Sequence, residues 1–280
     1  MIEKYEFNGE DEGISLLVLA AVHGNETAGT NAAFKVIKEL NSGELKLKSG
    51  RLTLVPICNP EAYKKDERCV EENLNRVITY HANPKTYEQK LANEIYPLIQ
   101  NHQIMLDLHS THCEGDVPFA FCDYPNEDNQ KLISALEVDF VLEGWPKIYS
   151  GESAIQDFST EQCAHILGNT GTTVECGYHK SSAAVDLAYK AIKSTLAVFG
   201  LIEHNQIKNH PKKHIQMDSY VLKTKEGKLC KNYKHLDPIS RGEKIAVYAD
   251  GEELYAPNDG FILLPNSQAD INTEWYYLGH

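Results

Sequence analysis

Metal-binding side chains follow directly on two apolar runs of the sequence. His23 and Glu26 stand three residues apart in HGNE, after the run at 14–22, and His109 follows the run at 104–108. An imidazole and a carboxylate spaced in this way at a strand-to-helix junction can turn toward one point, with Gly24 permitting the tight backbone between them. With a second imidazole they form the ligand set of a catalytic zinc site, which keeps its fourth position for water. The pattern predicts one Zn²⁺ per chain, held by His23, Glu26 and His109.

Other readings of these residues stay open. The spacing H-x-x-E is common by chance, and His109 alone is also explained as a hydrogen-bonded core histidine. Alternation along its strand places Asp107 on the same face as His109, where its carboxylate could support a ligating imidazole. His112 follows three residues later and is interpreted as part of a loop.

A short β-branched segment ends in a carboxylate. The strand predicted at 172–175 finishes at Glu175, before Cys176 and Gly177. A buried acid is costly unless it has a partner or a function, and a zinc-bound water needs a base of this type. Glu175 is therefore the candidate general base, and the alternative is a strand-end glutamate that faces solvent.

Arginine is scarce, with only Arg51, Arg68, Arg76 and Arg241 in the chain. Two of the four lie in the polar stretch 59–83, which lacks periodicity and is predicted to be a loop over the same sheet edge. Arg68 near a metal could polarise a scissile carbonyl, and Asn75 with Arg76 could clamp a substrate carboxylate. The alternative is surface ion pairing with neighbouring acids, which are Asp66, Glu67, Glu71 and Glu72.

Strand and helix signals alternate through the first two thirds of the chain. Apolar runs predict strands at 14–22, 52–57, 104–108 and 172–175, and helical periodicity predicts helices at 27–40, 87–99 and 183–199. Strands separated by helices indicate an α/β sheet with helices on both sides.

The pattern changes after a polar segment at 203–214, which is interpreted as a linker. Short alternating runs follow at 219–224, 244–248, 253–255 and 260–264, with hairpin-type turn signals at Asp250–Gly251 and Asp259–Gly260. A catalytic α/β domain is therefore expected at 1–204, and a small β domain that covers or borders the active site at 215–280.

Composition excludes several classes of function. The net charge of −13, from 40 acidic and 27 basic residues, argues against a nucleic-acid partner. No apolar run is long enough to span a membrane, and the charged N-terminus does not look like a signal peptide. The seven cysteines have no disulfide or zinc-site spacing. A cytoplasmic protein is expected.

These segments together resemble the succinylglutamate desuccinylase/aspartoacylase family, within the clan of zinc carboxypeptidases. The matching pieces are HGNE at 23–26, NP at 59–60, Arg68, NLNR at 73–76, DLH at 107–109 and VECG at 174–177. The resemblance implies a zinc-carboxypeptidase-like, mixed but mainly parallel sheet with flanking helices. It also implies that the C-terminal stretch forms that family's small β domain.

The resemblance assigns roles residue by residue. His23, Glu26 and His109 would be the zinc ligands, and Glu175 the general base. Arg68 would polarise the acyl carbonyl, and Asn75 with Arg76 would hold the α-carboxylate of the amino acid. A tyrosine near the C-terminus would reach the substrate. Tyr276 and Tyr277 are the candidates, and only one of two neighbours in a strand can face the site.

One departure from the family pattern bears on the substrate. Aspartoacylases carry an arginine shortly before the catalytic glutamate, whereas no arginine stands between Arg76 and Arg241 here. Either Lys147 or Lys180 takes its place, or the substrate side chain is not acidic. The expected function is hydrolysis of the amide bond of a small N-acyl amino acid. A metallocarboxypeptidase acting on a short peptide and a non-catalytic binding module are the alternatives, and a homodimer is left open.

Overall fold

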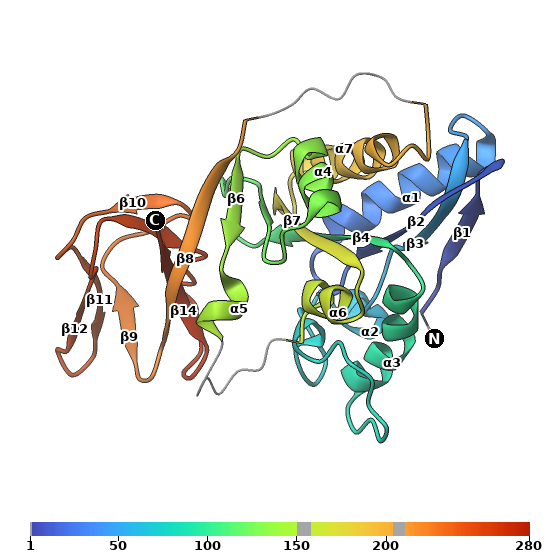
Figure 1. The fold of residues 1–280 in the computed structure, drawn as a ribbon. Coiled ribbons are helices and arrows are strands. Elements are labelled where there is room, and N and C mark those ends of the chain that lie inside the picture. Colours follow the sequence, from blue (N-terminus) through green and yellow to red (C-terminus); the bar gives the residue numbers. More distant parts are fainter. Residues whose placement is uncertain (1, 150–157, 204–210) are drawn as a thin grey trace.

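The fold comes from a computed structural model that describes residues 2–149, 158–203 and 211–280. Within those residues, eleven strands form one sheet in the order β1-β3-β2-β4-β7-β5-β6-β8-β14-β13-β10 (Figure 1). The first seven of these in chain order are β1 (Tyr5–Asn8), β2 (Asp11–Ala20), β3 (Ser49–Val55), β4 (Ile104–Thr111), β5 (Phe119–Phe121), β6 (Phe140–Glu143) and β7 (Thr170–Tyr178). The other four are β8 (Lys213–Leu222), β10 (Asp237–Ile239), β13 (Gly260–Leu263) and β14 (Glu274–Gly279).

Four parallel strands form the centre of the large sheet. β2 pairs with β3 and β4, and β4 pairs with β7, all in parallel. The buried parts of β2 (residues 16–20) and β3 (residues 52–55) are mostly apolar because both faces of the sheet are covered. All eight residues of β4 are buried. The carboxyl ends of β2, β4 and β7 therefore meet at one sheet edge.

Helices cover both faces of this centre (Figure 1). The long helices α1 (Thr27–Ser42) and α7 (Ser182–Val198) pack on one face, where alanines such as Ala32 and Ala188 lie in the same core cluster as Leu106. The helices α3 (Tyr87–Gln100) and α6 (Thr160–Ile166) pack on the other. The remaining helical segments are α2 (Pro60–Lys65), the 3₁₀ turn η1 (Leu74–Arg76), α4 (Glu127–Ala135) and α5 (Trp145–Ile148).

The C-terminal strands extend the main sheet. β8 pairs in parallel with β6, and β14, β13 and β10 then continue in antiparallel order. The strands β9 (Gly227–Leu229), β11 (Lys244–Tyr248) and β12 (Glu253–Tyr255) form a separate small sheet. A second core containing the fully buried Trp275 packs between these strands.

The predicted fold class is confirmed. The strands expected at 14–22, 52–57, 104–108 and 172–175 correspond to β2, β3, β4 and β7, and the expected helices to α1, α3 and α7. The division at 204 and 215 stays a prediction. Residues 204–210 of the expected linker lie outside the described residues, and β8 begins inside its last part.

Two local predictions were wrong. The stretch 59–83 is not all loop, because Asn59 caps α2 through its side chain and Pro60 begins the helix. Six helical residues are too few to show a periodicity. Asp259–Gly260 does not close a hairpin, since β12 and β13 belong to different sheets. Asp250–Gly251 does join the antiparallel pair β11 and β12.

The described residues include no helix that is both long and apolar enough to cross a bilayer.

Candidate functional site

The turn at 23–26 joins the carboxyl end of β2 to the first residue of α1. Glu26 stands at the N-cap position of α1, yet its side chain makes no capping hydrogen bond. Its carboxylate turns instead toward the end of β4. A Cβ on Gly24 would lie 2.2 Å from the backbone of Ala62 in α2. Glycine is required here because the turn packs against the α2 backbone.

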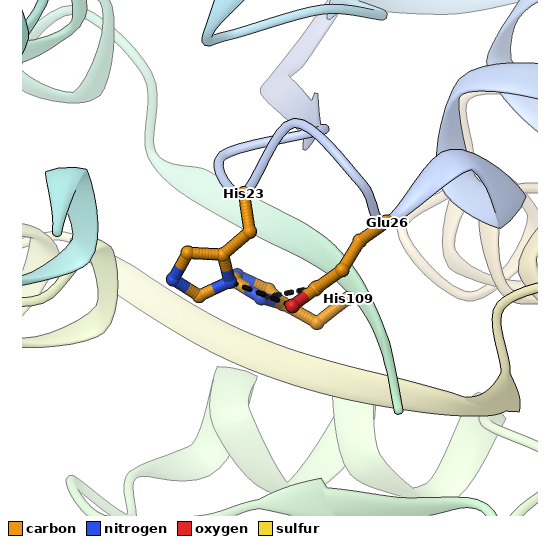
Figure 2. Close-up of side chains that lie close together, drawn as sticks. All are labelled: His23, Glu26 and His109. Carbon is orange, nitrogen blue, oxygen red and sulfur yellow. Dashed lines mark hydrogen bonds and ion pairs between the residues drawn. The ribbon is translucent and has the colours of Figure 1, made fainter. Parts of the chain in front are cut away.

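His23, Glu26 and His109 come together as predicted. Their potential ligand atoms all lie within 4.8 Å of one another, and all three residues are buried. His23 Nδ1 is 2.8 Å from Glu26 Oε1, and His109 Nδ1 is 2.9 Å from Glu26 Oε2 (Figure 2). Two imidazole nitrogens and a carboxylate that converge in this way match the donor set and the proximity of a two-histidine, one-carboxylate zinc site.

The other nitrogen of each imidazole is also held. His23 Nε2 lies 3.0 Å from Asn73 Oδ1, and His109 Nε2 lies 2.9 Å from Asp107 Oδ2. The Asp107 carboxylate in turn accepts a hydrogen bond from the Thr160 hydroxyl at 2.6 Å. With Nε2 held by Asn73 or Asp107, each Nδ1 faces Glu26, which is how ligating histidines are oriented in metal sites.

Burial and neighbouring charge tune this cluster. Burial lowers the pKa of His23 to about 4, with the Arg68 charge acting in the same direction, so His23 is neutral and able to bind a metal near pH 7. Burial works against the charged form of Glu26, but the two adjacent imidazoles hold its pKa well below the usual value.

Glu175 stands beside His109, which is its register partner across β4 and β7. Burial, followed by the negative charge of Glu26, raises the pKa of Glu175 to about 8. Its Oε2 atom is buried and has no hydrogen-bond partner among the residues that the structure describes. Native proteins rarely leave such an atom without a partner, and an unfilled one indicates a place for a ligand or a transferred proton.

Of the residues predicted in the 59–83 stretch, Arg68 contacts the cluster directly, and Asn75 and Arg76 contact other residues around it. Arg68 is half-exposed and its Nη1 donates to Glu26 Oε1 at 3.1 Å. Asn75 is buried, and its Oδ1 accepts the backbone N–H of Thr160 at 3.0 Å. The Arg76 guanidinium lies 5.1 Å from the Trp145 ring.

The two neighbouring tyrosines of β14 face opposite ways, as expected for a strand. Tyr276 is buried in the core of the C-terminal strands, and Tyr277 lines the same cavity as the metal cluster. The Tyr277 hydroxyl is 2.6 Å from that of Tyr149, and its ring stacks on Trp145 at 5.2 Å.

A cavity of about 600 Å³ connects these groups. It is lined by the three clustered side chains and by the other predicted site residues, which are Arg68, Asn75, Arg76, Glu175 and Tyr277. His112 also lines it, although the loop interpretation assigned it no contact with the site. Lys147 and Lys180 are not among the described residues that line the cavity.

Several residues of this site carried no recognisable sequence signal. Asn73 stands within the NLNR segment, but its role as the partner of His23 is seen only from their contact in the structure. Thr160 and Trp145 lie in the short helices α6 and α5, which periodicity did not predict. Glu274 is the first residue of β14. Their contacts depend on tertiary packing, which spacing along the chain does not report.

Known proteins resemble this chain in sequence and in fold. The model of the succinylglutamate desuccinylase/aspartoacylase catalytic domain matches residues 12–193. The chain belongs to the succinylglutamate desuccinylase/aspartoacylase family. The names of this family denote deacylases. The matched segment contains the metal cluster, Glu175 and the 59–83 stretch, whereas Tyr277 lies outside it.

Similar sequences carry the same family name. The succinylglutamate desuccinylase of Pseudomonas paraeruginosa is 32% identical over 132 residues, which are 44% of this chain and 39% of that protein. The alignment thus spans well under half the length of that relative. The succinylglutamate desuccinylase of Photorhabdus laumondii is 24% identical over 275 residues, covering 92% of this chain and 84% of that protein.

Solved structures show the same fold along the whole chain. A succinylglutamate desuccinylase/aspartoacylase from Rhodobacter sphaeroides has a TM-score of 0.78 at 17% identity, covering 100% of this chain and 88% of that one. The ectoine utilization protein EutE (DoeB) from Ruegeria pomeroyi has a TM-score of 0.78 at 18% identity, covering 100% and 89%.

Proposed function

We propose that this member of the family hydrolyses the amide bond of a small N-acyl amino acid in a zinc-dependent reaction. The observation that carries the proposal is the position of Glu175 beside the His23, Glu26 and His109 cluster. A buried carboxyl oxygen without a described partner then faces the same cavity as three converging ligand atoms. The names of the relatives favour an N-succinyl amino acid as one candidate substrate.

His23, Glu26 and His109 are the proposed zinc ligands, one ion per chain. A bound zinc ion supplies a Lewis acid that makes water a nucleophile near neutral pH. Asn73 and Asp107 keep the two imidazoles in the tautomer that directs Nδ1 at the metal. Arg68 donates to Glu26 in the structure and can also donate to a carbonyl oxygen, which places it to polarise the amide.

Glu175 is the proposed general base. Its carboxylate accepts a proton from the water as the water oxygen bonds to the amide carbon. It then returns that proton to the nitrogen as the carbon–nitrogen bond breaks, which leaves a carboxylic acid and an amine. The acid proton passes to the amine or to solvent, giving the carboxylate product. The positive charge of a bound zinc ion would lower the pKa of Glu175 from about 8 toward neutrality, which suits a group that must both accept and donate a proton.

The amino-acid part of the substrate is proposed to lie against Arg76, Asn75 and Tyr277. The Asn75 carbonyl oxygen already accepts from Thr160, so Asn75 would offer its amide nitrogen to the substrate. Arg76 supplies a forked donor for the α-carboxylate. The Tyr149 hydroxyl donates to Glu274, so the Tyr277 hydroxyl donates to Tyr149 and would offer its oxygen to the substrate as an acceptor.

Two rival functions are less well supported. A carboxypeptidase needs room for a peptide, whereas the C-terminal residues Asn266, Glu274 and Tyr277 line the cavity beside Arg76. A binding module has no use for a buried carboxyl such as Glu175 next to ligand atoms.

Metal analysis and a substrate screen test the proposal. Protein purified without chelator is expected to contain one zinc per chain, measured by elemental analysis. N-acetyl and N-succinyl amino acids are then screened for amine release. Folded protein without zinc, or zinc-loaded protein that splits peptides but no N-acyl amino acid, would contradict the proposal.

A further inference from the structure

The cavity has a strongly acidic wall at the end that Arg76 occupies. We use "acidic wall" for Asp123, Glu161 and Glu274, all of which line the cavity. Glu274 Oε1 lies 3.9 Å from Arg76 Nη2. Asp123 Oδ1 accepts the backbone N–H of Trp145, whose ring faces Arg76.

Glu161 joins the wall from the sheet side. It is 4% exposed, and its two oxygens accept the backbone N–H groups of Asp123 at 3.2 Å and Thr173 at 3.3 Å. Hydrogen bonds to backbone N–H groups stabilise a carboxylate as an anion without neutralising its charge. The wall is therefore built to keep negative charge inside the protein.

Positive charge is scarce around the same space. Of the described residues that line the cavity, Arg68 and Arg76 are the only lysines or arginines. Arg68 lies against Glu26 at the metal cluster. This leaves Arg76 as the cationic side chain beside the acidic wall.

Aromatic side chains complete this end of the cavity. Phe121, Trp145 and Tyr277 line it together with the acidic wall. Ring faces attract cations and also pack against an aliphatic chain. The position of Arg76 over Trp145 shows that the region already accommodates a guanidinium.

We propose that the released amino acid carries a cationic side chain, an ammonium or guanidinium on an aliphatic stem. This inference rests on the proposed deacylation. The metal cluster and the buried Glu175 oxygen mark the site independently, and the acidic wall decides only which side chain it admits. With a cationic side chain, Arg76 holds the α-carboxylate and the wall holds the cation. A substrate with an acidic side chain would bring its α-carboxylate and its side-chain carboxylate to a region that holds one arginine and three acids, where like charges repel.

The first test compares three amino acids that differ in the charge of the side chain. The zinc-loaded protein is assayed with the Nα-acetyl and Nα-succinyl derivatives of L-lysine, L-norleucine and L-glutamate. Norleucine matches the lysine stem without its charge. We expect kcat/KM for lysine to exceed that for norleucine by about 10-fold and that for glutamate by about 100-fold, since opposite and like charges a few ångströms apart act in opposite directions. A preference for glutamate or norleucine overturns the inference and leaves the deacylation standing.

A binding measurement separates failure of the inference from failure of the proposed function. Calorimetry of the free amino acids with the same protein is expected to rank lysine above norleucine and norleucine above glutamate. If no derivative is hydrolysed, the deacylation is contradicted and this ranking alone decides the side-chain preference. Equal or inverted affinities would overturn it.

A substitution in the wall provides the second test. Glu274→Gln removes one negative charge and keeps an oxygen that can accept from the Tyr149 hydroxyl, which lies 3.1 Å from Glu274 Oε1. The lysine-to-norleucine ratio of kcat/KM is expected to fall about 3-fold, since one of the three wall carboxylates loses its charge. Glu137→Gln, at an exposed ion pair with Lys190, is the matched control and should leave the ratio unchanged. An unchanged ratio in Glu274→Gln contradicts the role of the wall.

Discussion

The two ends of the cavity are built in different ways. The metal end consists of His23 and Glu26, which follow β2, and of His109 and Glu175, which lie near the carboxyl ends of the adjacent parallel strands β4 and β7. The amino-acid end combines Arg76 from the 59–83 stretch with residues from α5, α6 and β14, which lie far apart in the sequence. The sheet thus positions the proposed catalytic residues, and segments that pack around the sheet supply the residues proposed to select the substrate.

Glu175→Gln at the metal end should have the largest effect. Glutamine fills the same space but cannot accept the proton, so kcat is expected to fall by about 10³-fold while one zinc per chain stays bound. Turnover of the best substrate from the screen and zinc content are measured together. Persistent turnover with metal bound would show that another group is the base, and loss of metal would make Glu175 a ligand.

The metal end could be predicted from the sequence because its geometry follows from strand ends. His23 and His109 each stand directly after an apolar run, Glu175 follows a short β-branched one, and parallel strands bring their carboxyl ends to one edge. Alternation along β14 predicts that only one of Tyr276 and Tyr277 faces the site. Which of the two does so depends on the pairing of β14 with β8.

The amino-acid end could not be predicted in the same way. Trp145 lies in a four-residue helix, too short for any periodicity, and the Glu161 carboxylate meets Asp123 by accepting its backbone N–H, a contact between residues 38 positions apart. Their neighbourhood depends on how β5 and β6 pair with β7 and β8. The missing arginine before Glu175 indicated only that substrate recognition departs from the family pattern, and the acidic wall appears only in three dimensions.

Substitutions of the residues that hydrogen-bond the two imidazoles should have the next largest effect. Asp107→Asn keeps the side-chain volume but removes the charge that holds His109 Nε2 and the Thr160 hydroxyl. Zinc affinity, measured by chelator competition, is expected to fall about 10- to 100-fold. Asn73→Ala removes a neutral partner of His23 and should cost less. Equal affinities in wild type and Asp107→Asn would show that the contact does not tune the metal.

Acid should weaken the C-terminal region through His235. This imidazole is buried, and its Nδ1 accepts the backbone N–H of Leu264, a residue that lines the cavity. Burial lowers the pKa of His235 to about 3, below its ordinary value of 6.5. The unfolded chain therefore takes up a proton first, so the stabilising contribution is complete above about pH 6.5 and declines as the pH falls toward 3.

Replacement of His235 measures this contribution. Between pH 7 and 5, the wild type is expected to lose about 2 kcal/mol more unfolding free energy than His235→Asn. Urea unfolding followed by tryptophan fluorescence suits the purpose, because Trp145 and Trp275 both lie on the C-terminal side of the cavity. His214→Asn, at an exposed histidine, is the control. Parallel pH profiles in wild type and His235→Asn would exclude a neutral buried imidazole.

The smallest effect is expected from substitutions that compare the two faces of β14. Tyr277→Phe removes only a hydroxyl at the amino-acid end, so KM is expected to rise about 3- to 10-fold with kcat nearly unchanged, the loss of one hydrogen bond to substrate. Tyr276→Phe makes the same chemical change on the opposite face, in the core around Trp275, and should alter neither constant. If both variants raise KM equally, the hydroxyl of Tyr277 acts through the packing of β14. A rise confined to Tyr277→Phe means that the strand's alternation alone delivers one tyrosine to the substrate, so the amino-acid end also depends on sheet register at this position.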